Sequence, residues 1–415
     1  MQPNLGYFIH NVEMYYILHM RHIPTIGILK KRALITWLFL SCLIVGQQVA
    51  QAQESMSEYA LGSPLLITDK KEVLVEKLIF RHRLQPGQAA IQIRNCENIS
   101  VKNCAFIGIG AAIRVSGSKN VSVENCAFVD LFESGSSGVV PQIGVETYQV
   151  QGLFVEDCLF EFVSTGLYAA DSEDVTFKKN AIFNILGPYP RGQAVQFARV
   201  SGTRNLISEN YILNESEISA PQDCINLFKS FGIKDYPIRV ENNLILGDPT
   251  KGNQNQSPSG SGIMAGDGGG AFQLIRKNQL DSPGQVGIGV AGGDQIVIVE
   301  NVVRGGVTKY SNVGISVWSQ YPATSGMVMV MSNIIGWRNK DSRLNNNWQG
   351  EAKFGPKWEF SNVEWKDNQE VFPEDLQIHA QPSVLGWLLA EGAKYSILMK
   401  KRGGTPQQLF DGKPN

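Results

Sequence analysis

The sequence predicts an all-β solenoid, in which short strands stack coil upon coil. The first observation is a repeated phrase, Asn-x-x-Val-x-Asn-x-x-Phe, whose two clearest copies are residues 98–106 and 120–128. The second is its recurrence at intervals of about 22 residues, lengthened by insertions, which is typical of solenoid repeats. The third is composition, because 42 glycines and runs of Val and Ile that alternate with polar residues favour strands over helices.

The first 52 residues are interpreted as an N-terminal extension and a secretory signal peptide. A basic stretch at 30–32 precedes an apolar run at 33–45, and the small-residue pattern Ala-x-Ala ends at Ala52. These are the parts of a secretory leader. An apolar run of about 13 residues is too short for a transmembrane helix, which needs about 20. We therefore expect a secreted or periplasmic bacterial protein, cleaved near Ala52, with no transmembrane segment in its mature form.

Three further regions follow the leader. Residues 53–80 are expected to form an N-terminal cap region, 81–345 the solenoid, and 346–415 an aromatic-rich C-terminal cap and tail. The repeat is lost in this last region, where Trp348 and Trp387 occur and a helix is expected at 384–393. A cap is needed because an open solenoid end exposes apolar surface and an unpaired strand edge.

A second phrase, a small residue followed by apolar-x-apolar, lies upstream of each Asn phrase. Copies at 90–93 and 287–290 illustrate it. We expect nine or ten coils, each with two strands whose apolar positions face inward and whose intervening position faces outward. The polar residue that anchors each turn should stack in one column, formed by Asn103, Asn125, Asp157, Asn180, Asn210, Asn243, Asn278, Asn301 and Asn333.

Three of the six cysteines, Cys104, Cys126 and Cys158, each follow an anchoring residue. They should therefore form a column of buried free thiols, because buried cysteine behaves as a small apolar residue. A disulfide or a metal site is the weaker interpretation, since the sequence has no Cys-x-x-Cys and no histidine near these positions.

With these repeats, residues 85–340 resemble right-handed parallel β-helix proteins, the pectate-lyase-like superfamily in its broad sense. The resemblance implies right-handed coils. The same fold occurs in pectate lyases, polygalacturonases, alginate lyases, uronan epimerases, tailspikes and adhesins. No enzyme family's catalytic motif is matched. The polygalacturonase set Asn-Thr-Asp, Asp-Asp, His-Gly and Arg-Ile-Lys is absent, as is the epimerase histidine motif. Fold alone therefore does not give the function.

Outward-facing residues on successive coils predict a groove for a sugar chain. Asp171, Arg199, Lys229 and Asp267 should form a charged ladder with rungs about 4.8 Å apart. Planar groups stack on sugar faces, and cationic side chains pair with uronate carboxylates. The residues expected to bind substrate are Asp171, Gln196, Asp223, Asn226 and Asp267, with Trp318 and Tyr321 as an aromatic end wall and Arg191 as a clamp on a rim loop.

Cleavage of a uronate-containing polysaccharide by β-elimination is the leading interpretation. Arg199 would neutralise the uronate carboxylate, and Lys229 or Tyr168 would remove the neighbouring proton. Asp171 and Asp267 would orient these groups or hold Ca²⁺. A glycoside hydrolase would instead pair Asp223 or Asp267 with a second carboxylate, and an epimerase remains open.

A non-catalytic glycan-binding or surface adhesion module is the alternative from another class, with the ladder acting only as solvated salt bridges. The expected partner is a polysaccharide or surface glycan, and the protein is expected to be a monomer. The formal net charge of −1 gives no basis for nucleic-acid binding through bulk charge.

Overall fold

The computed structural model describes residues 59–378, apart from 82–83, 86, 132–141, 188–190, 216–218, 248–259 and 324. These residues belong to one compact unit, Tyr59–Val384. The expected leader, Trp387 and the helix expected at 384–393 lie outside the described residues.

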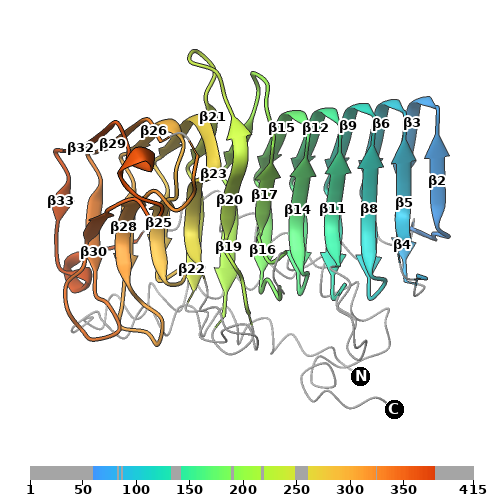
Figure 1. Ribbon diagram of the computed structural model, residues 1–415. Helices are drawn as coiled ribbons and strands as arrows, with labels where there is room; N and C mark the ends of the chain where they lie inside the picture. Colours follow the sequence, from blue (N-terminus) through green and yellow to red (C-terminus); the bar gives the residue numbers. More distant parts are fainter. Residues whose placement is uncertain are drawn as a thin grey trace, which may run out of the picture. The chain divides into compact units, whose positions relative to one another are not determined.

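Each coil is built from three short strands, not from the expected two, and the coils stack in order from β2 to β33 (Figure 1). The strands that open the coils are β2 (Leu65–Thr68), β5 (Ala89–Arg94), β8 (Ala111–Ser116), β11 (Ile143–Tyr148), β14 (Thr165–Ala170), β17 (Val195–Ala198), β20 (Ile225–Phe231), β23 (Ser261–Arg276), β25 (Val286–Val290), β28 (Val313–Trp318) and β31 (Asn347–Gly350). We refer to them as the first row.

The second strands of the coils are β3 (Lys71–Glu76), β6 (Glu97–Lys102), β9 (Lys119–Glu124), β12 (Gln151–Glu156), β15 (Glu173–Lys178), β18 (Leu206–Ser208), β21 (Ile238–Glu241), the second half of β23, β26 (Asp294–Val299), β29 (Met327–Met331) and β32 (Asn362–Lys366). The third are β1 (Ala60–Leu61), β4 (Leu78–Phe80), β7 (Ala105–Ile107), β10 (Ala127–Val129), β13 (Leu159–Glu161), β16 (Ala181–Phe183), β19 (Tyr211–Asn214), β22 (Leu244–Gly247), β24 (Gln279–Asp281), β27 (Val302–Gly305), β30 (Ile334–Trp337) and β33 (Gln369–Glu370).

Strands in each row pair in parallel with their copies one coil away. Parallel pairing extends on both sides of the expected 81–345 range, because β2 pairs with β5 and β31 pairs with β28. Of two short 3-10 helices, η2 (Pro356–Trp358) lies between β31 and β32, and η3 (Pro373–Asp375) follows β33.

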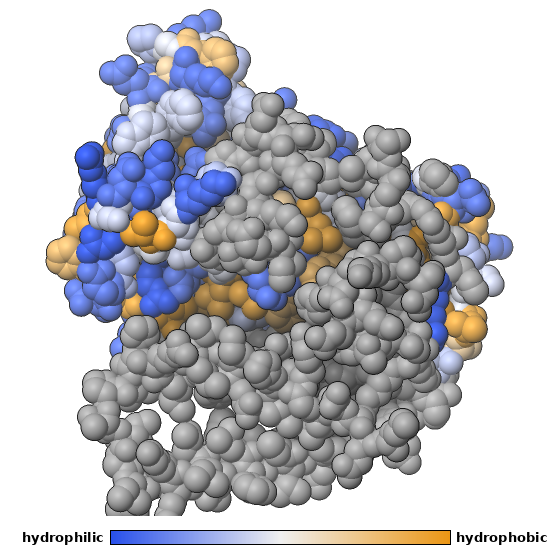
Figure 2. Space-filling model, turned by 90° about the horizontal axis from the view of Figure 1, so that it is seen from below, coloured by the Kyte–Doolittle hydropathy of each residue, from blue (hydrophilic) through white to orange (hydrophobic). Residues whose placement is uncertain are grey.

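Stacked phenylalanines fill the core of the first coils. The ring centroids of Phe80, Phe106, Phe128 and Phe160 follow one another at 5.0, 4.9 and 4.6 Å, with planes within 5° of parallel. This distance equals the spacing of neighbouring strands, about 4.8 Å, so one residue per coil builds a continuous apolar column. On the outside, hydrophobic residues lie among hydrophilic ones on the described part of the lower face (Figure 2).

The predicted column of anchoring residues is wrong by one position in its first three members. Ala105, Ala127, Leu159 and Ala181 are in register, so the residues before them, Cys104, Cys126, Cys158 and Asn180, share one turn position. Asn103, Asn125 and Asp157 lie one residue earlier, each in the left-handed region with φ of 52°, 52° and 54°.

The cysteine column is confirmed and continues directly into an asparagine ladder. Cys104 N–H donates to Cys126 Sγ at 3.5 Å, and Cys126 N–H donates to Cys158 Sγ at 3.5 Å. Cys158 N–H then donates to Asn180 Oδ1 at 2.9 Å. The five cysteines in the described part of the chain are buried and free. Sulfur, a weak acceptor, therefore occupies the place that an amide oxygen takes in later coils.

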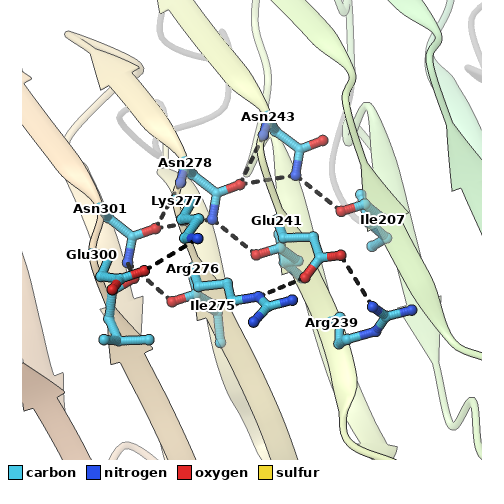
Figure 3. A network of polar contacts seen from close by, with 12 residues as sticks. Ile207, Arg239, Glu241, Asn243, Ile275, Arg276, Lys277, Asn278, Glu300 and Asn301 are labelled. Carbon is cyan, nitrogen blue, oxygen red and sulfur yellow. Dashed lines mark hydrogen bonds and ion pairs between the residues drawn. The ribbon is translucent and has the colours of Figure 1, made fainter.

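The asparagine ladder satisfies its own buried amides. Asn243 Nδ2 donates to Asn278 Oδ1 at 2.9 Å and to Ile207 O at 3.0 Å (Figure 3). Asn278 repeats the pattern toward Asn301. Because each amide bonds to the coils on both sides, the ladder fixes the stacking register at the turns between the second and third strands.

Candidate functional site

The outward column of the first row runs as the sequence predicts. Glu146 is in register with Arg114 and Tyr168, and Gln196 with Tyr168 and Asn226. These five side chains therefore follow one another at the strand spacing along one face. Tyr168, Gln196 and Asn226 are expected substrate-site residues.

A double β-bulge interrupts this column where β20 meets β23. Asn226 pairs with Met264, but Phe228 pairs with Asp267, so β23 has an extra residue between them. Gly266 has a φ of 59°, and a Cβ there would lie 1.9 Å from Gly292 O. Only glycine fits this position, and the bulge turns Asp267 toward Asn226. Bulges of this kind re-aim side chains next to functional sites.

Asp223, Asn226, Asp267 and Tyr321 form the cluster that we call the carboxylate cluster. Asn226 Nδ2 donates to Asp223 Oδ2 and to Asp267 Oδ2, both at 2.9 Å. Because both oxygens bond to the same nitrogen, they lie no more than 5.8 Å apart, twice that distance. Tyr321 Oη donates to Asp267 Oδ1 at 2.6 Å. Neither carboxylate forms an ion pair within the described part of the chain.

Asp223 is the most buried acid of the cluster, with 7% of its surface exposed. Its Oδ1 accepts a hydrogen bond from Ser261 N–H at 2.7 Å. Burial raises the pKa of Asp223 to about 6, and the charge of Asp267 adds to the rise, while the Ser261 and Asn226 hydrogen bonds oppose it. A carboxyl with this pKa can hold and release a proton near neutral pH.

Two buried acceptor oxygens beside the cluster have no hydrogen-bond partner within the described residues. They are Gln196 Oε1 and Asn226 Oδ1, and their residues are 8% and 2% exposed. Buried acceptors are usually satisfied. A ligand that brings hydroxyl donors to this face would satisfy both.

The expected charged ladder holds for one step and then breaks. Arg199 donates to Asp171 through Nε at 2.5 Å and Nη2 at 2.7 Å, and this bidentate contact lowers the pKa of Asp171. Lys229 is exposed and forms no ion pair in the described structure; its Nζ lies 5.2 Å from the centre of the Phe228 ring. The bulge places Asp267 opposite Phe228, so Asp267 does not continue the ladder.

Tyr168 lies between aromatic and cationic neighbours. The Arg191 guanidinium carbon is 3.7 Å from the centre of its ring, and the Tyr148 ring is 6.0 Å away in an edge-on arrangement. The described residues therefore place the expected rim clamp, Arg191, directly against Tyr168.

None of the contacts described for Trp318 reaches the carboxylate cluster. Its Nε1 donates to Glu351 O at 2.9 Å, and its ring is 5.9 Å from Trp348. Of the two expected wall residues, only Tyr321 is bonded to the cluster. Sequence reasoning missed Ser261, whose backbone N–H donates to Asp223, and the bulge glycine Gly266, since no motif marks either position.

The two carboxylates considered for Ca²⁺ have different partners. Asp171 is bound by Arg199, and Asp267 by Asn226 and Tyr321. Among the residues with described positions, no group of three or more His, Cys, Asp or Glu side chains could hold a metal ion. The same residues contain no helix with the length and apolar character needed to cross a membrane.

Comparisons with known proteins agree with this architecture. The family model described as right handed beta helix region matches residues 65–252 and 143–326. No curated protein matches.

Among solved structures, the chain is similar to the Streptococcus pneumoniae surface protein and adhesin PfbA (13% identity, TM-score 0.41, covering 75% of this chain and 80% of that one). It is also similar to a mutant of the periplasmic alginate epimerase AlgG (12% identity, TM-score 0.43, 74% and 77% covered). A third is a hyperthermoactive exopolygalacturonase from Thermotoga maritima (11% identity, TM-score 0.40, 77% and 87% covered).

The two matched ranges of the family model overlap and together span residues 65–326, more than half of the 415-residue chain. The parallel pairing of the three strand rows agrees with this match. The predicted fold is therefore confirmed, and the chain belongs to the right-handed β-helix family.

Proposed function

We propose that this protein is an exported glycoside hydrolase that cleaves a uronate-containing polysaccharide at the carboxylate cluster. The observation that carries the proposal is the pairing of Asp223 and Asp267 through one amide, with no ion pair to either carboxylate among the described residues. Pairs of carboxyl groups in different environments provide the acid and the base of glycoside hydrolysis.

The environments assign the two roles. Asp223, with its pKa raised to about 6 by burial, is the general acid and gives its proton to the oxygen of the leaving sugar as the glycosidic bond breaks. Asp267, held by Tyr321 and Asn226, is the carboxylate that attacks the anomeric carbon. Asp223 then removes a proton from water, and the water oxygen displaces Asp267 from that carbon. Gln196 Oε1 and Asn226 Oδ1 accept hydrogen bonds from hydroxyl groups of the bound sugar.

The separation of the two carboxylates favours retention of configuration. Their facing oxygens lie within 5.8 Å, which is closer to the roughly 5–5.5 Å of retaining enzymes than to the roughly 6.5–9.5 Å of inverting ones. Proton NMR of the first product formed should therefore show the anomer of the substrate. Appearance of the opposite anomer first would assign Asp267 to the activation of water instead.

Product analysis tests the reaction class. The mature protein is incubated with pectate, alginate, and glucuronate-containing polysaccharides, and the reducing ends and ultraviolet absorbance are followed together. Hydrolysis produces new reducing ends without new absorbance. A rise in reducing ends that survives in the Asp223→Asn and Asp267→Asn variants would contradict the assignment.

Cleavage by β-elimination is the second candidate, and the position of Tyr168 favours it. Arg191 lies on the Tyr168 ring and Arg199 follows on the next coil, so a uronate carboxylate held by the two guanidinium groups would bring its neighbouring proton toward a base, Tyr168 or Lys229. Elimination creates an unsaturated sugar that absorbs ultraviolet light. If all polysaccharides give neither reducing ends nor absorbance but one of them binds, the protein is a non-catalytic glycan-binding module.

A further inference from the structure

A concave surface lies beside the turns that join the first and second strands of these coils. It is a recess of about 720 Å³, lined by Arg199, Lys229, Phe231, the glycines 268–270, Asp294 and Ala323. None of the four residues of the carboxylate cluster lines it. Its volume falls within the range of small-molecule sites, roughly 300–1,000 Å³.

Phe231 supplies an exposed aromatic wall. Half of its surface, 51%, is accessible. It ends β20, just before a tight hairpin closed by an antiparallel bridge between Ile233 and Tyr236. This turn between β20 and β21 projects beyond its neighbours (Figure 1). The bridge fixes the hairpin, so the aromatic ring is held beside the recess.

Lys229 supplies an uncompensated cation. It is exposed, has no ion pair in the described structure, and its aliphatic stem crosses Gly268, where a Cβ would lie 3.1 Å from both Lys229 Cγ and Cε. Arg199, by contrast, is already bound to Asp171. The glycine floor therefore leaves the stem in place and the ammonium group available to an anion.

Asp294 supplies a fixed acceptor in the lining of the recess. Its Oδ1 accepts hydrogen bonds from the backbone N–H groups of Gln295 and Met327, both at 2.8 Å. These bonds hold the carboxylate in one orientation. A flat aromatic ring, one cation and one fixed acceptor match a sugar that presents an apolar face, an acidic group and hydroxyl groups.

We propose that this recess is a second glycan-binding site that takes one acidic sugar unit, with its ring against Phe231 and its acidic group at Lys229. The site is separate from the carboxylate cluster, so it does not rest on the proposed hydrolysis. It would bind a glycan beside the turns between the first and second strands, whether or not the protein cleaves a polysaccharide.

Saturation-transfer NMR with methyl glucuronide and its neutral counterpart, methyl glucoside, tests the site. The wild type should bind the glucuronide more tightly, and Lys229→Gln should weaken glucuronide binding about threefold to fivefold without changing glucoside binding, as expected for one exposed ion pair. Phe231→Ala should weaken both sugars about tenfold, and Phe231→Tyr should restore them. High salt should reduce the preference for the glucuronide.

Two controls separate this site from the rest of the protein. Lys234→Gln removes another exposed lysine of the same hairpin and should leave both affinities unchanged. Asp267→Asn should also leave recess binding unchanged, whereas it tests the proposed hydrolysis. Equal saturation in wild type and in the Lys229→Gln, Phe231→Ala double variant, or no saturation of either sugar in wild type, would overturn the proposal.

Discussion

Glu146, on the first row, and Asp223, two residues before a strand of that row, are two buried carboxylates with opposite surroundings. Glu146 on β11 is 9% exposed and accepts hydrogen bonds from Arg114 Nε and from Tyr148 Oη, each at 2.8 Å. Asp223, just before β20, is 7% exposed, accepts hydrogen bonds from the neutral groups of Ser261 and Asn226, and has a second carboxylate beside it. Burial is nearly equal, so the difference lies in the counter-charge.

We interpret this difference as the one between a structural carboxylate and the carboxylate proposed for catalysis. A buried charge that is paired with a cation contributes to a stable arrangement, whereas one without a cation is held at a free-energy cost unless it binds a proton. Burial raises the pKa of Asp223 to about 6, so Asp223 binds that proton as the pH falls through 6. Burial and the Glu146 charge likewise raise the pKa of Tyr148 to about 12, which keeps its hydroxyl donating to Glu146. Perturbed acids without a cationic partner are candidates for catalysis.

The largest expected effect is the loss of activity on removing either carboxylate of the cluster. Asp223→Asn and Asp267→Asn should each lower kcat by about 10²–10⁴-fold, because each removes one acid–base function. Stability in urea should not fall, since the buried charge is removed with the function. Glu146→Gln is the matched control on the same row, and its kcat should stay within about threefold of wild type. Comparable losses at Glu146 would show that the whole face, not the cluster, is needed.

The second effect is the pH dependence of stability that Asp223 causes. Its pKa is about 6 in the folded protein and 3.8 without burial, so the folded state binds the proton more tightly. Its contribution to stability is therefore present below pH 4 and is lost as the pH rises through 6, by up to about 3 kcal/mol.

Urea unfolding at pH 5 and pH 7.5 measures this effect. Wild type should lose stability over this interval relative to Asp223→Asn, whose side chain does not titrate. The same slope in both proteins would show that Asp223 is not the titrating group. The pKa of Asp171 is lowered by Arg199, so its contribution to stability is lost only as the pH falls below the ordinary range of an aspartate pKa. It therefore does not interfere between pH 5 and pH 7.5.

A third experiment converts the structural carboxylate into one without its cation. Arg114→Gln removes the guanidinium from Glu146 but keeps a polar side chain, and it should lower the free energy of unfolding by about 1–3 kcal/mol at pH 7. The double variant Arg114→Gln, Glu146→Gln should recover most of the stability at pH 7. No recovery would mean that packing of Arg114, not charge, is responsible.

The coils were predictable because their inward positions repeat with period two, and the same period fixes which side chains face outward. The register of the residues at the turns was not predictable. In the repeat that contains Asn103, the asparagine stands one position before the column residue Cys104, whereas in a later repeat Asn180 itself occupies the column. Only the series of strand pairs that runs from Ala105 through Ala127 and Leu159 to Ala181 places Cys104 and Asn180 in one column.

Part of the candidate site was predictable for the same reason. Asp171 and Arg199 are adjacent because no bulge lies between their strands. Asp267 was misplaced relative to Lys229, because a sequence that contains Gly266 and three later glycines does not reveal which residue is bulged. Tyr321 bonds to Asp267 across 54 residues, and this contact depends on the path of the loop after β28, which has no repeat to predict it.

The smallest expected effect concerns Arg199, because its ion pair with Asp171 is exposed, whereas the carboxylates Glu146 and Asp223 are buried. Its side chain and that of Asp171 are 47% and 43% exposed, so solvent screens their attraction and Arg199→Gln should lower the free energy of unfolding by less than about 1 kcal/mol. The lowered pKa of Asp171 means that this small contribution is present at neutral pH and is lost as the pH falls through the folded-state pKa. Urea unfolding at pH 7 and pH 3 measures it.

Hydrolysis at the carboxylate cluster should continue in the Arg199→Gln variant, because Arg199 contacts neither Asp223 nor Asp267 in the described structure. A fall in cleavage of 100-fold or more, without loss of stability, would instead indicate that Arg199 binds the carboxylate of the reacting uronate. That result would favour elimination over hydrolysis.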